Sequence, residues 1–145
     1  MQNGTKATSS EPNELPAMLA TLCSYEGWFG PYHPQTLSLM VRVGIAYWQA
    51  GEVQFARTVL ERAVSDLGRH VVHNHDLRLR AIGALRDVVV AQRDYERAAV
   101  VEKELLECQI ARLGSDHPET LATRADLGMI LLEKISGAAS GLPRS

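Results

Sequence analysis

The feature that most constrains this chain is a sequence repeat with a period of 42 residues, marked by His33, His75 and His117. The octet GPYHPQTL at residues 30–37 returns as GSDHPETL at residues 114–121, two periods later. The middle copy keeps little beyond its histidine. A period of about 20–50 residues is typical of arrays whose stacked units share one continuous core. Such arrays normally present a surface to a partner, so the repeat predicts a binding protein.

The hydrophobic pattern between the chain ends is helical. In residues 35–50 the side chains of Leu37, Met40, Val41 and Tyr47 follow the i, i+3, i+4 spacing of a helix with one buried stripe, and strict alternation fails. No strand pattern competes with it elsewhere. The predicted helices span residues 13–28, 35–50, 53–67, 76–91, 95–113 and 119–135.

Proline and glycine mark the predicted helix ends. Pro34 and Pro118 fall in the first turn of a helix, where the missing N–H costs nothing. Gly51, Gly68 and Gly114 stand where a left-handed residue would end a helix. The chain is therefore divided into a flexible tail (1–12), one domain (13–135) made of a half repeat (13–28), two repeats (30–68 and 72–113) and a half repeat (114–135), and a second flexible tail (136–145).

Composition excludes several classes of partner. The net charge is −2, and no cluster of lysine and arginine offers a basic field for nucleic acid or an anionic membrane. No apolar run approaches the ~20 residues that span a bilayer, and the polar first residues do not resemble a secretion signal. Cys23 and Cys108 have no metal-binding or disulfide spacing, so we expect reduced thiols in the core or at its boundary. A soluble cytoplasmic protein is predicted.

Small residues at fixed places within each pair of helices allow close packing. In the first pair these are Gly44 on the first helix and Ala56 and Ala63 on the second, with Tyr47 filling the space around them. This combination resembles the tetratricopeptide repeat (TPR). The phrase LGSDHPETL at residues 113–121 further resembles the 42-residue TPR type of kinesin light chains. The resemblance implies an all-α fold, a right-handed superhelical array (α-solenoid) of antiparallel helix pairs with about six helices.

The same resemblance implies a concave face, lined by the first helix of each pair, that binds a peptide or a partner protein. Trp48 beside Val41 and Ile45 would seat an apolar side chain, and Arg42 and Arg80 would bind a carboxylate. The alternative is that Trp48 packs against helix 13–28 and the arginines are solvated. The residues predicted to contact a partner are Val41, Arg42, Ile45, Trp48, Gln49, Arg80, Asp87, Asp126, Met129 and Glu133.

Two further functions stay open. The last helix carries Leu127, Ile130, Leu131 and Ile135 with no following helix to cover them, which favours a scaffold that forms a homodimer through this face. The other is a regulatory adaptor subunit of a larger signalling or transcription complex, suggested by where such repeats occur.

Enzymatic and metal functions find little support. His70, His73 and His75 crowd one connection and are chemically plausible ligands for zinc or nickel. A connection between helices favours polar residues in any case, and His75 stands at the start position of its repeat. No acid/base pair or activated nucleophile is evident. We therefore predict no catalytic residue, no bound metal and no cofactor.

Overall fold

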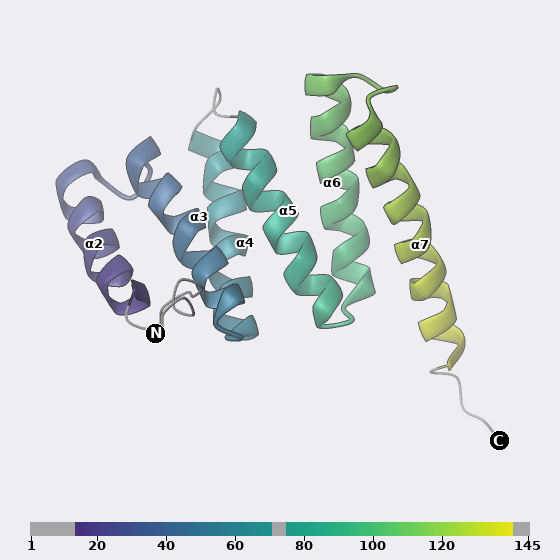
Figure 1. Cartoon of the computed structure of the whole chain (residues 1–145), viewed down its shortest axis with the longest axis horizontal. Coiled ribbons are helices and arrows are strands. Elements are labelled where there is room, and N and C mark those ends of the chain that lie inside the picture. The colour runs from purple at the N-terminus through teal and green to yellow at the C-terminus, as the bar shows by residue number, and fades with distance from the viewer. Residues whose placement is uncertain (1–13, 71–74, 141–145) are drawn as a thin grey trace, which may run out of the picture. The chain divides into compact units, whose positions relative to one another are not determined.

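The computed structural model describes residues 14–70 and 75–140, and within these ranges the chain forms six helices and no strand (Figure 1). The all-α fold predicted from the repeat is confirmed. The helices are α2 (Glu14–Phe29), α3 (Pro34–Gln49), α4 (Val53–His70), α5 (His75–Ala91), α6 (Tyr95–Leu113) and α7 (Pro118–Ser140).

Two helix ends differ from the prediction. Gly68 does not end α4, which continues to His70, because this glycine does not take a left-handed backbone conformation. It instead leaves room for the Arg78 side chain, whose guanidinium would lie 3.6 Å from a Cβ at this position. α7 runs to Ser140, five residues past the end predicted at residue 135, so residues 136–140 of the expected tail are helical. Ala138 and Ala139 favour helix here, because alanine has the highest helix propensity.

A histidine caps the first helix of each outer repeat. His33 lies just before α3, and its Nδ1 accepts a hydrogen bond from the backbone N–H of Gln35 at 3.1 Å. His117 does the same before α7, with the N–H of Glu119 at 3.1 Å. Each imidazole thus satisfies one of the amide groups that a helix start leaves unpaired. The predicted role of the repeated His-Pro pair as a helix start is confirmed.

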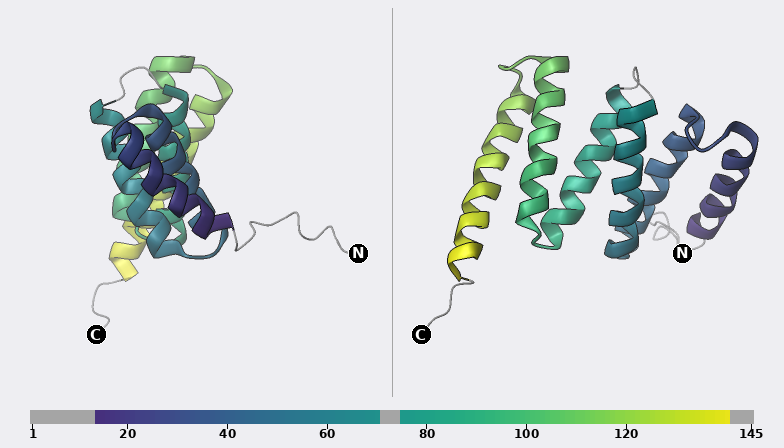
Figure 2. Two further views of the ribbon diagram at one scale, coloured as in Figure 1. Left: turned by 90° about the vertical axis from the view of Figure 1, so that its left-hand side faces the viewer. Right: turned by 180° about the vertical axis from the view of Figure 1, so that it is seen from behind.

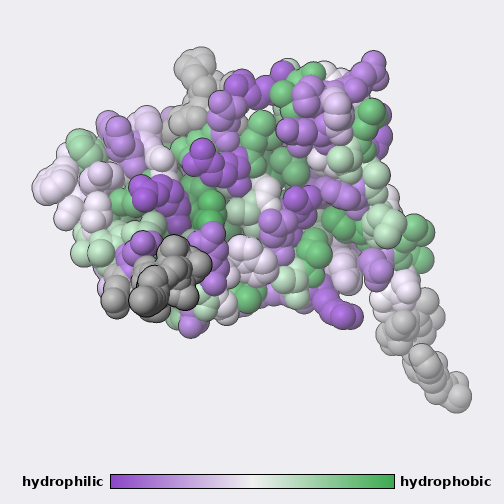
Figure 3. Space-filling view, viewed as in Figure 1, coloured by the Kyte–Doolittle hydropathy of each residue, from purple (hydrophilic) through white to green (hydrophobic). Residues whose placement is uncertain are grey.

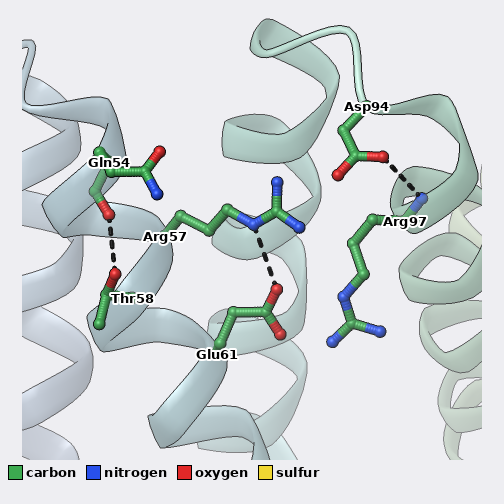
Figure 4. A network of polar contacts seen from close by, with 6 residues as sticks. All are labelled: Gln54, Arg57, Thr58, Glu61, Asp94 and Arg97. Carbon is green, nitrogen blue, oxygen red and sulfur yellow. Dashed lines mark hydrogen bonds and ion pairs between the residues drawn. The ribbon is translucent and has the colours of Figure 1, made fainter.

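The turn inside each repeat also recurs with the 42-residue period. Gly51 has φ of 82° in the turn between α3 and α4, and Arg93, one period later, has φ of 59° between α5 and α6. After the second of these turns, Asp94 accepts a hydrogen bond from the backbone N–H of Arg97 at 3.2 Å and so caps α6 (Figure 4). The turn geometry is kept although the glycine is not.

The core of the first pair depends on one close approach between α3 and α4, which pack side by side. Gly44 lies against Leu60, and a Cβ built on the glycine would come within 2.6 Å of the leucine Cγ and Cδ2. Leu60, Ala56 and Ala63 are all fully buried. The small-residue positions predicted from the sequence are therefore those at which the two helices meet.

Two polar contacts on α4 join residues one turn apart. Arg57 and Glu61 form an ion pair at 3.3 Å one turn apart, and the Thr58 hydroxyl donates to the carbonyl of Gln54 at 3.1 Å (Figure 4). An ion pair of this i, i+4 kind adds only about 0.3–0.5 kcal/mol on a helix surface. Burial of α4 against α3 therefore contributes more to its stability than these pairs do.

α6 and α7 run side by side in opposite directions, as two views show (Figures 1 and 2). Ala98 and Glu102 of α6 are fully buried, and Ile130 of α7 is 7% exposed. At the end of the pair, Lys134 lies 3.6 Å from Glu96. One side of α7 is thus fixed against α6.

The chain divides into two compact units, one up to Val88 and one from Val89 onward. Each helix of a repeat array contacts only its neighbours in the chain, so its contacts are local and fall into separate groups. The first unit holds α2, α3 and α4, and the second holds α6 and α7. α5 contributes to both. The single domain proposed over residues 13–135 stays a prediction.

Replacing Gly44 by alanine tests the close approach of α3 and α4. The added Cβ would collide with Leu60, so we expect a loss of about 1–3 kcal/mol in the free energy of unfolding, measured by urea denaturation. In a Leu60→Ala background the loss should shrink, because alanine lacks the Cγ and Cδ2 that the new methyl meets. Gly128→Ala is the matched control: it stands two periods later in open space and should be neutral or slightly stabilising. Equal losses at both glycines would contradict this packing.

Replacing Gly114 by alanine tests the loop before α7. Gly114 has φ of 98° and ψ of 157°, a conformation that only glycine adopts without strain. We expect Gly114→Ala to lower the free energy of unfolding by about 1–3 kcal/mol. Gly137→Ala, within helix and with no atom near the new methyl, should be neutral or stabilising. Similar thermal midpoints for both variants would show that the loop tolerates a side chain.

Candidate functional site

A groove runs between α2 and α3, and a buried threonine holds its two walls together. Thr36 is fully buried in the first turn of α3, and its hydroxyl donates to the carbonyl oxygen of Tyr25 on α2 at 3.4 Å. Next to this contact, Tyr25, Trp28 and Phe29 form a group of aromatic rings with centroids 5.4–6.4 Å apart. The end of the groove near Tyr25 is therefore held in place by contacts between α2 and α3.

Two adjoining pockets of about 220 Å³ and 200 Å³ lie along this groove. Both are open to the surface and combine apolar with polar side chains. Met18 and Arg42 border both of them, so the two pockets are neighbours along the groove. The first is also lined by Ala17, Thr21, Tyr25, Gln35, Ser38 and Leu39, and the second by Glu14, Ile45, Ala46 and Gln49.

Arg42 is the charged group that the two pockets share. It is exposed on α3, and it makes no hydrogen bond or ion pair with any residue that the structure describes. Glu14 lines the second pocket but forms no ion pair with this arginine. The guanidinium therefore keeps its five N–H donors available for a ligand.

The predicted residues on α3 have different environments. Ile45 is half-buried and Gln49 exposed, and both line the second pocket with Arg42. Trp48 is half-buried and lines neither of these two pockets. Val41 is fully buried, so it supports the helix from within and offers no surface to a ligand. The structure thus brings three of the five predicted residues of this helix together.

The remaining predicted contact residues lie on other helices. On α5, Arg80 is exposed, and Asp87 is exposed and accepts a hydrogen bond from Arg86 at 2.8 Å. On α7, in the other compact unit, the three predicted residues are exposed. The structure does not join any of these to the groove, and their role in binding stays a prediction. The α7 residues are Asp126, Met129 and Glu133.

The four residues proposed for a dimer face differ in how exposed they are. Leu131 and Ile135 are 42% and 66% exposed, whereas Leu127 is half-buried and Ile130 is buried. Ile130 faces the interior of its unit and cannot form part of an outer surface. The exposed apolar side of α7 instead includes Leu132, at 63%.

The sequence prediction missed the contribution of α2 to the groove. Its residues Met18, Thr21 and Tyr25 line the pockets, although residues 13–28 were predicted only as a half repeat. The repeat did contain a signal for this contribution. Met18 stands 42 residues before Leu60, and Leu60 packs on the first helix of its own pair.

The other candidate sites find no support in the described residues. The His70 ring stacks on Tyr32, with centroids 3.8 Å apart, while His73 and the side chain of His75 lie outside what the structure describes. No group of three potential metal ligands occurs in the described part of the chain. Cys23 is exposed, not in the core, and Cys108 is half-buried. Across residues 14–70 and 75–140, no helix combines the length and apolar character that crossing a bilayer requires.

Known structures confirm the fold. No protein-family model and no curated protein matches the chain. Two crystal structures of the nearly identical TPR-like repeats of a putative kinesin light chain from Podosopora anserina are similar to it, each at 22% sequence identity. One, a variant form, has a TM-score of 0.72 and the other 0.69. The matches cover 83% and 90% of this chain, and 57% and 68% of the respective solved chains. This chain therefore has the fold of a TPR-like helical repeat protein.

Proposed function

We propose that this chain is a protein–protein interaction module that binds a segment of a partner protein in the groove between α2 and α3. The observation that carries the proposal is the exposed Arg42, which has no partner among the described residues and borders both pockets. A binding role also agrees with the TPR-like fold, which is generally associated with protein interaction.

The chemistry of the groove favours a segment with one acidic and one apolar side chain. The Arg42 guanidinium is a planar fork that matches a carboxylate with two parallel hydrogen bonds. Met18 and Ile45 line the second pocket together with Arg42 and offer apolar surface there. Methionine adapts to different shapes, so this wall suits more than one apolar side chain.

Pocket size favours a peptide over a cofactor. Sites for small molecules usually enclose about 300–1,000 Å³, and each of these pockets is smaller than that and open to the surface. Each has room for a single side chain. A chain crossing the groove would place neighbouring residues in the two pockets. We infer a binding function without catalysis, since TPR-like folds are typically non-catalytic.

Charge reversal at Arg42 tests this proposal. A display library of peptides with random sequence is selected on the parent protein, and the recovered peptides are expected to share an acidic residue close to an apolar one. Arg42→Glu should weaken their binding at least tenfold, measured by fluorescence anisotropy, because a hydrogen bond to a charged group is worth about 1.5–3 kcal/mol. The thermal midpoint of this variant should equal that of the parent, since the Arg42 side chain is exposed and makes no contact that folding needs.

Arg69→Glu is the matched control, because Arg69 is also exposed in the first unit but lies on α4, away from both pockets. It should leave peptide binding unchanged. A second selection on Arg42→Glu should recover basic in place of acidic residues. Peptides without an acidic residue, or equal weakening by the two substitutions, would overturn the proposed site.

A further inference from the structure

α7 is the first helix of a repeat whose second helix is missing from the described chain. Gly128 stands 84 residues after Gly44, the glycine against which Leu60 of α4 packs. A Cβ on Gly44 would come within 2.6 Å of Leu60, whereas a Cβ on Gly128 would meet nothing within 4 Å. The contact surface for a second helix is therefore present on α7, but none of the described helices of its unit covers it.

Exposure along α7 supports this comparison. Leu37 of α3 is fully buried, while Leu121, at the same repeat position, is 48% exposed. Leu132 and Ile135 are 63% and 66% exposed, and hydrophobic residues reach the surface over the C-terminal half of α7 (Figure 3). Isolated apolar residues on a surface are ordinary, but a row of them beside an open glycine indicates an unoccupied helix contact.

α2 is the converse case. It corresponds to the second helix of a repeat, and the described chain holds no first helix before it. Leu60, Ala63 and Leu67 of α4 are fully buried in their pair. One period earlier, α2 has Met18, Thr21 and Tyr25, and these are half-buried or exposed. They line the first pocket of the groove, so this pocket marks the side of α2 that lacks its first helix.

We propose that copies of this chain associate head to tail, with α7 of one copy packed against α2 of the next. Repeat equivalence fixes the register: Met18 of one copy would pack on Gly128 of the other, as Leu60 packs on Gly44. The contact would complete one full repeat. This inference rests on the proposed function of the groove as a protein-binding site and names a second copy as its occupant.

α7 also has the chemistry that the groove favours in a ligand. Glu133 is exposed next to the exposed Leu132, so the helix offers an acidic and an apolar side chain together. Because the two contacting surfaces are different, the association is not two-fold symmetric. Each added copy leaves one α7 and one α2 free, so the assembly grows instead of stopping at a dimer.

Two substitutions separate the two surfaces without disturbing the fold of either unit. Gly128→Leu fills the open side of α7, and Thr21→Arg places a long charged side chain on the exposed side of α2. Gly137→Leu is the control for α7, since it makes the same change half a turn round the helix, also in open space. Ala20→Arg is the control for α2, because Arg62 occupies the same repeat position and is exposed.

Sedimentation velocity over micromolar to millimolar concentrations is the measurement. The weight-average mass of the parent and of both controls should rise with concentration past that of a dimer. Gly128→Leu alone and Thr21→Arg alone should both remain monomeric. An equimolar mixture of these two should form a complex of two chains and grow no further, because each variant supplies the surface that the other has lost.

Three results would overturn the inference. The parent could remain monomeric at all concentrations, the mixture could fail to associate, or Gly128→Leu alone could abolish a closed dimer that Thr21→Arg leaves intact. The last result would indicate a two-fold contact between α7 helices. Peptide binding that depends on Arg42 in a monomeric parent would preserve the proposed function while excluding a second copy as the occupant.

Discussion

The contact between Gly44 and Leu60 is the interaction on which the rest of the structure depends. Without a Cβ on the first helix, the second helix comes close enough to bury a whole leucine, and the alanines around it follow from the same spacing. Each helix of such a pair still has a second side that only a neighbouring repeat can cover. The groove beside α2 and the open side of α7 both follow from this requirement.

Much of the fold could be predicted from the sequence because its signals are local. The His33 and His117 caps, the prolines that follow them and the left-handed Gly51 and Gly114 each act within one turn of backbone. The 42-residue period then aligns a position that lacks such a residue with one that has it. In the turn between α5 and α6, Arg93 stands where the first repeat has Gly51. Gly68 was predicted wrongly because its role is set by a contact with Arg78 on the next helix.

The candidate site could be predicted only in part, because it depends on which neighbour is missing. Spacing placed Arg42, Ile45 and Gln49 on one side of α3, where they line one pocket, but it also included Val41, which is in the core. It could not show that Met18 and Thr21 of α2 form the opposite wall, since a helix that lacks its partner exposes residues that a complete repeat would bury.

The two outer repeats differ at one buried threonine, and this bears on the start of α7. The Thr36 hydroxyl donates to the carbonyl oxygen of Tyr25, but Thr120, at the same repeat position, is buried without a hydrogen-bond partner among the described residues. Each such group costs about 1–3 kcal/mol. At this position α7 therefore lacks a hydrogen bond that α3 has. Anything that binds only folded α7 adds stability by mass action, so an occupant of its open side would offset this cost.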